Sequence, residues 1–293
     1  MNIVRGKVHS ALRVLVYGPP GCGKSSFACG ASYPSREPAP GVLALDYEHG
    51  LDAIGPARVE GPRDWEPALD LVREACAGPG DHTTVVIDTV DALADVAASA
   101  ICARGVKGKK VDSLAEFGYG DGFEILAAHW RTLLHALESA RAKGRAVILV
   151  AHVKRDSVDD PQVGRYAAWQ AALPKLCWQE THRWCDDVLF ANYEMAVADK
   201  TTRAFHTGSR WLYTIAGTGY AAKNRGELPA QIPLSWDAYQ AARKLGTRSA
   251  DEMIGAIRAI QYDAEKLPAM LAWAGNDVGK LMTLERKLKE KSA

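Results

Sequence analysis

The sequence lacks the features that mark secreted, membrane-spanning and strongly charged proteins. None of its apolar runs is long enough to cross a bilayer and no secretory signal is recognisable, so we expect a cytoplasmic protein without a membrane partner. The formal net charge of its 293 residues is only +1, which excludes a globally basic nucleic-acid-binding protein. Any site for nucleic acid must therefore be a local patch.

Cysteine is scarce and is not arranged for a disulfide framework. The six cysteines are scattered, and no two of them form a Cys-x-x-Cys pair. Cys177, His182 and Cys185 lie close together in the sequence, but a fourth zinc ligand is not evident. We therefore expect buried thiols rather than a metal site there, in a protein of a reducing compartment.

What the sequence does contain is a complete phosphate-binding loop. Its residues are Gly18, Pro19, Pro20, Gly21, Cys22, Gly23, Lys24 and Ser25, with Ser26 opening the helix that follows. The glycines let backbone N–H groups turn toward phosphate oxygens, Lys24 reaches the β- and γ-phosphates, and the Ser25 hydroxyl binds Mg²⁺. Because an apolar strand precedes the loop and a helix follows it, we predict a site for a nucleoside triphosphate, ATP, with Mg²⁺.

Apolar runs alternate with helical patterns in the first two thirds of the chain, which is typical of a mostly parallel sheet covered by helices on both faces. The expected strands are Leu12–Tyr17, Val42–Asp46, Thr84–Asp88, Ala146–Ala151 and Val188–Tyr193. The spacing of apolar residues predicts helices over Trp65–Ala77 and Phe123–Arg141. Two long polar segments, Ala103–Gly122 and Val153–Ala171, interrupt the pattern and are expected to be functional or mobile loops.

The character of the sequence changes after Thr201. We expect two paired strands, Thr202–His206 and Arg210–Ile215, around Thr207, Gly208 and Ser209, and an edge strand at Gln231–Leu234. From Ser249 onward the pattern is helical, with a capping box at Ser249, a second helix from Pro268 and a third over Val278–Lys291. The chain is therefore divided into a core of residues 1–245 and a helical tail of residues 246–293.

The strand Thr84–Asp88 ends in a carboxylate that suits a second contact to Mg²⁺. A simple strand-end cap is the alternative interpretation of Asp88. The next residue is Thr89, whereas motors of the AAA+ type place the water-activating glutamate directly after this aspartate. The sequence thus points away from such motors, and the general base must come from elsewhere.

Glu48 is the candidate general base. It lies 24 residues after Lys24, just beyond the strand Val42–Asp46. A carboxylate there would lie at the carboxyl edge of the sheet, where it can orient a water for in-line attack on the γ-phosphate. Asp46 is the rival carboxylate, and an exposed loop acid is the other interpretation of Glu48.

Together these motifs resemble the ATPase core of the RecA recombinase superfamily. The resemblance rests on the phosphate-binding loop, on the run Asp46–Asp52 (Asp-Tyr-Glu-His-Gly-Leu-Asp) and on the run Val86–Leu93 (Val-Ile-Asp-Thr-Val-Asp-Ala-Leu). It covers about residues 10–235 and implies an α/β, RecA-like P-loop NTPase core with a mostly parallel central sheet flanked by helices, followed by a small C-terminal helical appendage.

The resemblance also implies a role for His152, which follows the strand Ala146–Ala151. In this superfamily the corresponding strand ends in a polar residue that senses the γ-phosphate and couples it to a DNA-binding loop. A histidine at this point is similar to the phage-encoded and helicase-like branches. A strand-end histidine that makes only a structural hydrogen bond is the alternative.

The segment Ala222–Gly226 resembles the Lys-x-Arg-x-Gly element of hexameric helicases and related ATPases. In those proteins the lysine and arginine of one subunit reach the γ-phosphate bound by its neighbour. The resemblance therefore implies that Lys223 and Arg225 complete the site in trans, in a homo-oligomer that is either a ring or a filament. A solvated basic turn is the alternative.

In RecA-like proteins two DNA-binding loops occupy the places of the two polar segments. The candidate DNA-binding residues are Arg104, Lys107, Lys109 and Lys110 in the first, and Lys154, Arg155, Arg165 and Tyr166 in the second, where Trp169 is also available for base stacking. Asp156, Asp159 and Asp160 dilute the positive charge of the second, and a solvated charged face is the alternative. Single-stranded DNA is favoured because no segment reads as a major-groove helix.

We therefore expect an Mg²⁺-dependent, DNA-stimulated ATPase that acts on single-stranded DNA in recombination. It is most similar to the compact phage-encoded ATPases of the single-strand annealing or recombinase type. That likeness places it in the cytoplasm of a host cell and makes a single-strand-binding protein a candidate partner of the tail. The alternatives are a ring-shaped DNA helicase-like motor, a P-loop small-molecule kinase, and a structural protein with vestigial nucleotide binding.

Overall fold

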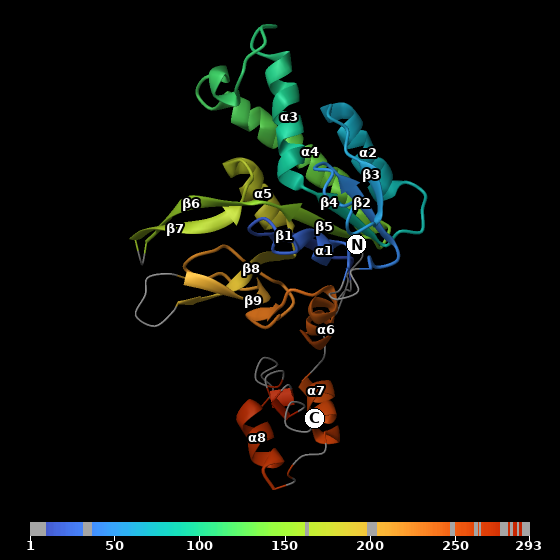
Figure 1. Cartoon of the computed structure of the whole chain (residues 1–293), viewed down its shortest axis with the longest axis vertical. Helices are drawn as coiled ribbons and strands as arrows, with labels where there is room; N and C mark the ends of the chain where they lie inside the picture. Colours follow the sequence, from blue (N-terminus) through green and yellow to red (C-terminus); the bar gives the residue numbers. More distant parts are fainter. Residues whose placement is uncertain are drawn as a thin grey trace, which may run out of the picture.

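The computed structural model describes residues 10–31, 37–161, 164–197, 204–246, 250–260, 263, 265–275, 281, 284–285 and 287–288. Among them, eight strands form one sheet in the order β10-β9-β8-β1-β5-β4-β2-β3 (Figure 1). The bounds are β1 Arg13–Tyr17, β2 Val42–Asp46, β3 Ala57–Glu60, β4 Thr84–Asp88, β5 Ala146–Ala151, β8 Asp187–Val197, β9 Ala204–Tyr213 and β10 Gln231–Pro233. From β8 to β3 neighbouring strands are parallel, whereas β9 and β10 are added antiparallel.

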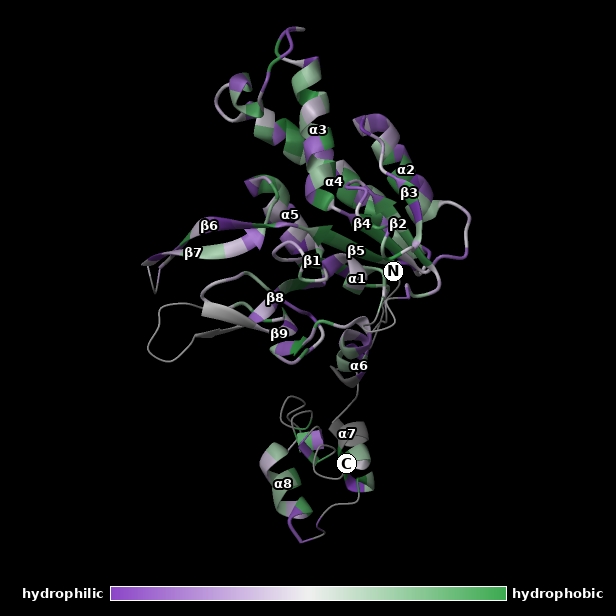
Figure 2. Ribbon diagram, viewed as in Figure 1, coloured by the Kyte–Doolittle hydropathy of each residue, from purple (hydrophilic) through white to green (hydrophobic). Residues whose placement is uncertain are grey.

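Helices cover both faces of this sheet. Their bounds are α1 Lys24–Ala28, α2 Trp65–Ala77, α3 Val90–Arg104, α4 Asp121–Ala142, α5 Lys175–Trp184 and α6 Trp236–Gly246, with a 3₁₀-helix at Leu114–Phe117. Successive side chains of a strand point to opposite faces, so Leu15 and Tyr17 join the core beneath α2 to α5, whereas Val14 and Val16 join the core beneath α1 and α6. Figure 2 shows the central strands as a hydrophobic layer between more polar helix surfaces.

The predicted fold class is confirmed: the chain has an α/β, P-loop NTPase core with a mostly parallel sheet flanked by helices. The predicted bounds of β2, β4, β5 and α2 agree with the structure, and the predicted helix Phe123–Arg141 lies within α4. The parallel strands were predictable because burial on both faces requires near-continuous runs of valine, isoleucine and leucine.

The expected pair of strands around Thr207, Gly208 and Ser209 is wrong. These residues lie inside one strand, β9, which runs antiparallel to β8. Between the pairs Tyr193–Arg210 and Met195–His206 the register shifts, so β9 carries the surplus residues as an irregularity, where Gly208 has a φ of 93°. A turn signal in the sequence thus marks a bulge rather than a hairpin.

The two polar segments are also more ordered than loops. Val153–Ala171 forms a two-stranded antiparallel hairpin, β6 (Val153–Asp160) and β7 (Gly164–Ala171), which extends from the end of β5 (Figure 1). Ala103–Gly122 contains the end of α3, a bridge between Val106 and Lys109, and the 3₁₀-helix. Neither segment has an apolar face typical of a buried element, which is why sequence patterning missed them.

The tail contains α7 (Ala250–Ala259) and α8 (Leu267–Ala274), and Pro268 stands in the first turn of α8 as expected. Ile257, Ala274, Leu281, Leu284 and Leu288 form its own hydrophobic cluster. The proposed cap at Ser249 and much of the expected helix Val278–Lys291 lie outside the described residues. Within the described part of the chain, no helix combines the length and apolar character needed to cross a membrane.

Candidate active site

The phosphate-binding loop lies at the carboxyl edge of the sheet, where β1, β5 and β4 end side by side. Gly21 and Gly23 adopt φ values of +75° and +106°, which glycine tolerates best. A Cβ at Gly18 would lie 2.0 Å from the Ala191 carbonyl oxygen, so the loop passes directly over β8. The predicted loop residues therefore form one tight turn between β1 and α1.

Lys24 is only 7% exposed, and its ammonium donates a hydrogen bond to the Pro19 carbonyl oxygen at 3.0 Å. This bond spans the loop, so the charge lies within the curve that the loop amides line. The arrangement fits a polyanionic phosphate chain, which would replace the single carbonyl as partner of the ammonium.

Asp88 is buried at the end of β4 and accepts a hydrogen bond from the Ser25 side chain. Burial is the main cause that raises its pKa to about 6; the Ser25 hydrogen bond opposes the shift, and the nearby Glu48 and Asp46 carboxylates add to it. A buried hydroxyl–carboxylate pair surrounded by excess negative charge fits Mg²⁺, which prefers oxygen ligands. Ser25 and Asp88 are the residues that would hold this ion.

The structure separates the roles of the two rival carboxylates. Asp46 is buried, and its oxygens accept backbone hydrogen bonds at 3.2 to 3.3 Å from Glu48, Gly50 and Leu51. It therefore shapes the turn that carries Glu48. The Glu48 side chain is 36% exposed and accepts a hydrogen bond from the Thr89 hydroxyl at 2.7 Å. Of the two, Glu48 is the one accessible to a water molecule.

His152 lies between these elements and is held by Asp91. The Asp91 Oδ1 accepts the His152 backbone N–H at 2.9 Å, and its Oδ2 lies 2.8 Å from the imidazole Nδ1. The same Nδ1 lies 3.3 Å from the Glu48 Oε1. The structure thus brings the predicted residues Glu48 and His152 together, and adds Asp91 and Thr89, which lie in the run Val86–Leu93 but were not predicted as site residues.

Glu48, Asp91 and His152 each place one potential ligand atom within 4.8 Å of the others. Such a spacing is compatible with a metal ion, but imidazole is a poor ligand for Mg²⁺. The hydrogen bonds among the three side chains and Thr89 already account for the cluster. Cys177 and Cys185, as expected, are buried free thiols, and burial raises the pKa of Cys177 to about 12.

Two further residues from the β8–β9 side contact the loop. The Tyr193 hydroxyl donates to the Gly21 carbonyl oxygen at 2.8 Å, and the Arg210 guanidinium donates to the Cys22 carbonyl oxygen at 3.4 Å. Arg210 also lies over the Tyr193 ring, 5.5 Å from its centroid. No local motif marks these residues, because they reach the loop from strands more than 160 positions away.

Lys223 and Arg225 lie at the opposite edge of the sheet. Lys223 pairs with Val188 near the start of β8, where Asp187 is level with Val14 of β1, whereas the phosphate-binding loop follows Tyr17. The Lys223 ammonium donates to the carbonyl oxygens of His182 and Arg183. The Arg225 guanidinium donates to the Asp186 carboxylate and to the Arg183 carbonyl oxygen. Neither cation contacts the loop of its own chain.

A buried carboxylate supports this basic turn. Asp187 accepts hydrogen bonds from the Arg225 backbone N–H at 3.3 Å, the Tyr239 hydroxyl at 2.5 Å and the Arg243 guanidinium at 3.2 Å. A Cβ at Gly226 would lie 2.1 Å from the same guanidinium. Helix α6 therefore fixes the backbone of the turn, and a side chain at position 226 would have to displace the Arg243 guanidinium.

The predicted DNA-binding residues of the β6–β7 hairpin fall on two faces. Paired residues share a face, so Lys154 and Tyr166 lie with Ala168, which is buried, whereas Arg155, Arg165 and Trp169 lie on the other face. Lys154 donates to the Leu173 carbonyl oxygen at 2.6 Å, and the Arg155 guanidinium lies 5.1 Å from the Trp169 ring centroid. Both arginines are therefore on the second face, and both are exposed.

The first predicted DNA segment lies elsewhere. Lys107, Lys109 and Lys110 are on the exposed turn after α3, and Arg104 forms a 3.0 Å ion pair with Glu66. In Figure 1 this end of α3 lies well apart from the β6–β7 hairpin. One chain therefore does not bring the two segments into a single patch.

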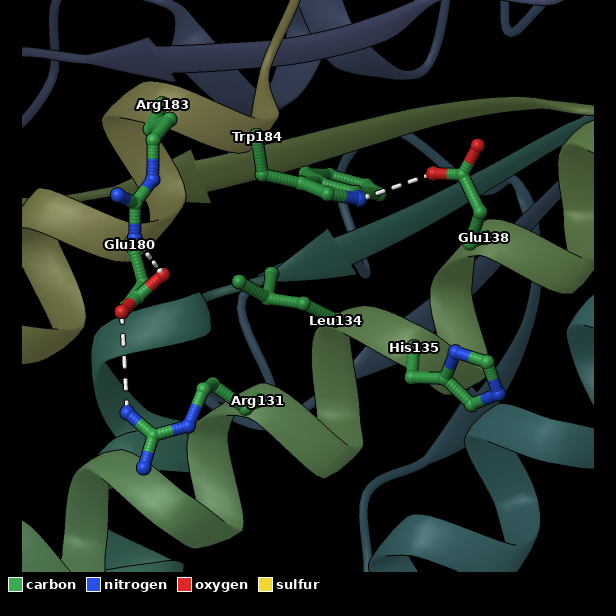
Figure 3. Close-up of a pocket in the computed structure, with 7 residues that line it drawn as sticks. All are labelled: Arg131, Leu134, His135, Glu138, Glu180, Arg183 and Trp184. Atoms are coloured by element: carbon green, nitrogen blue, oxygen red, sulfur yellow. Dashed lines mark hydrogen bonds and ion pairs between the residues drawn. The ribbon is translucent and has the colours of Figure 1, made fainter.

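An open pocket of about 380 Å³ lies between α4 and α5 (Figure 3). Leu134 and Trp184 line it, and Glu180 lies between Arg131 and Arg183 at one side. None of the predicted nucleotide-site residues lines it. It adjoins the basic turn, because the backbone carbonyl oxygen of Arg183 accepts the hydrogen bonds from Lys223 and Arg225.

The loop, the buried acid at the end of β4 and the sheet around them define a P-loop NTPase. The chain belongs to the family described as AAA domain, whose model matches residues 10–226. The prediction that the general base does not directly follow Asp88 stays open to test: the next residue is Thr89, whose hydroxyl donates to the Glu48 Oε1. No curated protein matches the chain.

Proposed function

We propose that this ATPase-type protein is an Mg²⁺-dependent ATPase that acts on single-stranded DNA in recombination, as a single-strand annealing protein or a recombinase. The observation that carries the proposal is the position of His152. Its imidazole touches the Glu48 carboxylate, and the next residue, Val153, begins the β6–β7 hairpin. The residue that contacts Glu48 is therefore directly followed by an exposed hairpin that carries Arg155 and Arg165.

Each predicted residue has a distinct role in this proposal. Lys24 and the loop amides bind the phosphates of ATP, and Ser25 and Asp88 hold Mg²⁺, which neutralises charge on the phosphates when bound. Glu48 orients the attacking water. The Thr89 hydroxyl holds the Glu48 carboxylate in place by donating a hydrogen bond to its Oε1 at 2.7 Å.

Lys223 and Arg225 would act on the site of a neighbouring subunit. Their place at the opposite edge of the sheet excludes contact with their own loop without a large rearrangement, which favours action in trans. An isolated subunit should then hydrolyse ATP slowly. Supply of a cation in trans is worth about 10³–10⁵ in rate where such fingers have been measured.

Two substitutions separate binding from turnover. Lys24→Ala should abolish ATP binding, because the loop loses its buried cation, whereas Glu48→Gln should bind ATP with unchanged affinity and lower turnover by at least about 100-fold. Binding is measured by calorimetry and turnover by phosphate release. Asp52→Asn, an exposed acid just beyond the same turn, is the matched control. Normal turnover by Glu48→Gln would remove Glu48 as the base.

The DNA partner is tested by the ATPase rate with and without single-stranded DNA, followed alongside the oligomeric state by light scattering. We expect stimulation only in the assembled species. Equal ATPase rates with and without DNA would favour another class of P-loop protein, such as a small-molecule kinase.

A ring-shaped helicase-like motor is the second candidate, and the basic turn at Lys223 and Arg225 favours it equally. The two differ in what hydrolysis accomplishes. Annealing of complementary strands that survives Glu48→Gln supports the annealing protein, whereas processive unwinding that stops with this substitution supports the motor.

A further inference from the structure

Asp91 connects the first turn of α3 to the end of β5 through a single residue, His152. One carboxylate oxygen accepts the backbone N–H of His152 at 2.9 Å, and the other lies 2.8 Å from its Nδ1. Both contacts converge on the point where β5 ends between the phosphate-binding loop and Asp88. Asp91 therefore fixes both the backbone and the ring of His152.

This contact determines which ring nitrogen carries the proton. An ionised carboxylate only accepts hydrogen bonds, and both acceptors near Nδ1, Asp91 and Glu48, are carboxylates. Nδ1 must therefore be the protonated nitrogen of the neutral ring. Nε2 then carries a lone pair and can accept a hydrogen bond from water, but it cannot donate one to a phosphate oxygen.

The neighbouring Thr89 orients the other member of the pair. Its hydroxyl donates to the Glu48 Oε1, the same oxygen that lies 3.3 Å from the imidazole Nδ1. Residues 89 to 91, directly after Asp88, thus hold both Glu48 and His152. The two candidate catalytic side chains form one network rather than two independent groups.

We propose that Asp91 is a positioning residue that holds His152 in the tautomer with the proton on Nδ1, so that Nε2, on the other side of the ring from Glu48, accepts a hydrogen bond from water. The protonated Nδ1 also faces the Glu48 Oε1, so the ring that Asp91 holds helps to orient this carboxylate. That this network serves ATP hydrolysis rests on the function proposed above; the tautomer does not.

The tautomer is measured on the full chain without nucleotide. In protein carrying ¹⁵N-labelled histidine, the His152 resonances are those missing from the spectrum of His152→Gln. At pH 8 we expect a protonated Nδ1 and an unprotonated Nε2. An Nε2 that carries a proton, in either a neutral or a charged ring, would overturn the proposal whatever the ATPase activity is.

Asp91→Asn tests the residue itself. Asparagine has one accepting oxygen for two donors, so its NH₂ must face either the backbone N–H or Nδ1, and the second choice transfers the ring proton to Nε2. We expect the His152 spectrum to change and kcat to fall by about 10-fold or more, with KM for ATP within about 2-fold. Asp95→Asn, one turn further along α3, should change neither.

A double-mutant cycle shows whether Asp91 acts through His152. In the His152→Gln background, Asp91→Asn should lower kcat by no more than about 2-fold further, because the ring it positions is gone. An equal loss in both backgrounds would mean that Asp91 only supports the fold. If the protein proves to have no ATPase activity, the proposed function fails, and the spectrum alone still decides the Asp91 assignment.

Discussion

The nucleotide site brings three carboxylates together, two of them buried. Asp88 and Asp46 are buried, and Glu48 is near enough for its charge to raise the pKa of Asp88. Asp46 is stabilised by backbone N–H groups, whereas Asp88 has the Ser25 hydroxyl and the more distant Lys24 charge. Without a bound cation, the ionised form of Asp88 therefore destabilises the fold.

Asp88→Asn should stabilise the protein while it abolishes Mg²⁺-dependent ATP binding. Burial raises the folded-state pKa of Asp88 to about 6 from its ordinary value of 3.8, so the folded protein holds the proton more tightly than the unfolded chain. Above pH 6 the charged form costs on the order of 2–3 kcal/mol, and a neutral asparagine avoids that cost. We expect a higher free energy of unfolding at pH 8 without nucleotide, measured by urea denaturation.

The pH dependence is the discriminating observation. The gain from asparagine should shrink as the pH falls from about 6 toward 3.8, where folded Asp88 takes up its proton, and vanish below that range. Glu74→Gln, on the exposed face of α2, should show no such profile. A loss of stability at pH 8 would contradict the account of Asp88 as an uncompensated buried charge.

At the residue scale, motifs predicted the part of the site that is local in sequence. The phosphate-binding loop and Asp88 are contiguous patterns, and Glu48 follows from its place after the second strand. Asp91, Tyr193 and Arg210 were not predictable, because their partners come from distant strands and depend on the register of the sheet.

Among the elements, predictability followed burial. Strands β2, β4 and β5 are apolar because helices cover both sides of the sheet, and their bounds could be predicted to the residue. The β6–β7 hairpin has no such requirement, since much of it faces solvent and polar residues alternate with few apolar ones. The two strands predicted in place of β9 are wrong because Gly208, a residue type common in turns, lies in an irregular part of one strand.

The two faces of the β6–β7 hairpin should contribute differently to DNA binding. Arg155→Ala and Arg165→Ala should each weaken binding of single-stranded DNA and reduce the slope of log affinity against log salt by about 0.7, since each removes one phosphate contact. Lys154→Ala should leave the salt slope unchanged, because its ammonium donates to the Leu173 carbonyl oxygen within the chain. Fluorescence anisotropy with a labelled oligothymidine, from 50 to about 300 mM salt, measures both quantities.

Asp159 offers a control of opposite sign. Its carboxylate lies 3.8 Å from the Arg165 guanidinium, so Asp159→Asn should free the arginine and strengthen DNA binding. If all four variants had the salt slope of the unsubstituted protein, the hairpin would not be a DNA-binding element. The exposed turn after α3, with Lys107, Lys109 and Lys110, would then remain as the candidate.

On the scale of the whole molecule, the proposed catalytic parts lie at opposite edges of one sheet. Glu48 and the phosphate-binding loop are at the carboxyl edge, and Lys223 and Arg225 are near the start of β8. The two edges are about 10 Å apart along β1, the distance from Val14 to Tyr17 in an extended strand. If Lys223 and Arg225 complete the site as proposed, two chains must meet in a head-to-tail, heterologous contact, which forms rings when it closes and filaments when it does not.

Mixing two inactive variants tests this arrangement. Glu48→Gln lacks the general base but keeps Lys223 and Arg225. The double substitution Lys223→Ala, Arg225→Ala keeps the phosphate-binding loop and the general base but lacks both cations. In a mixed oligomer the turn of the first can complete the site of the second, in roughly a quarter of the interfaces at equal ratio. We therefore expect phosphate release by the mixture to recover to about a quarter of the unsubstituted rate, although each variant alone is inactive.

The matched control mixes Glu48→Gln with Lys24→Ala. Both lesions belong to the same half of the site, so no interface of this mixture contains an intact loop together with an intact base, and no activity should return. Native mass spectrometry must show mixed oligomers in both experiments. Recovery in the first mixture alone places Lys223 and Arg225 on the neighbouring site; equal inactivity of both mixtures, with mixed oligomers present, would leave these cations as braces of α5, bound to the carbonyl oxygens of His182 and Arg183.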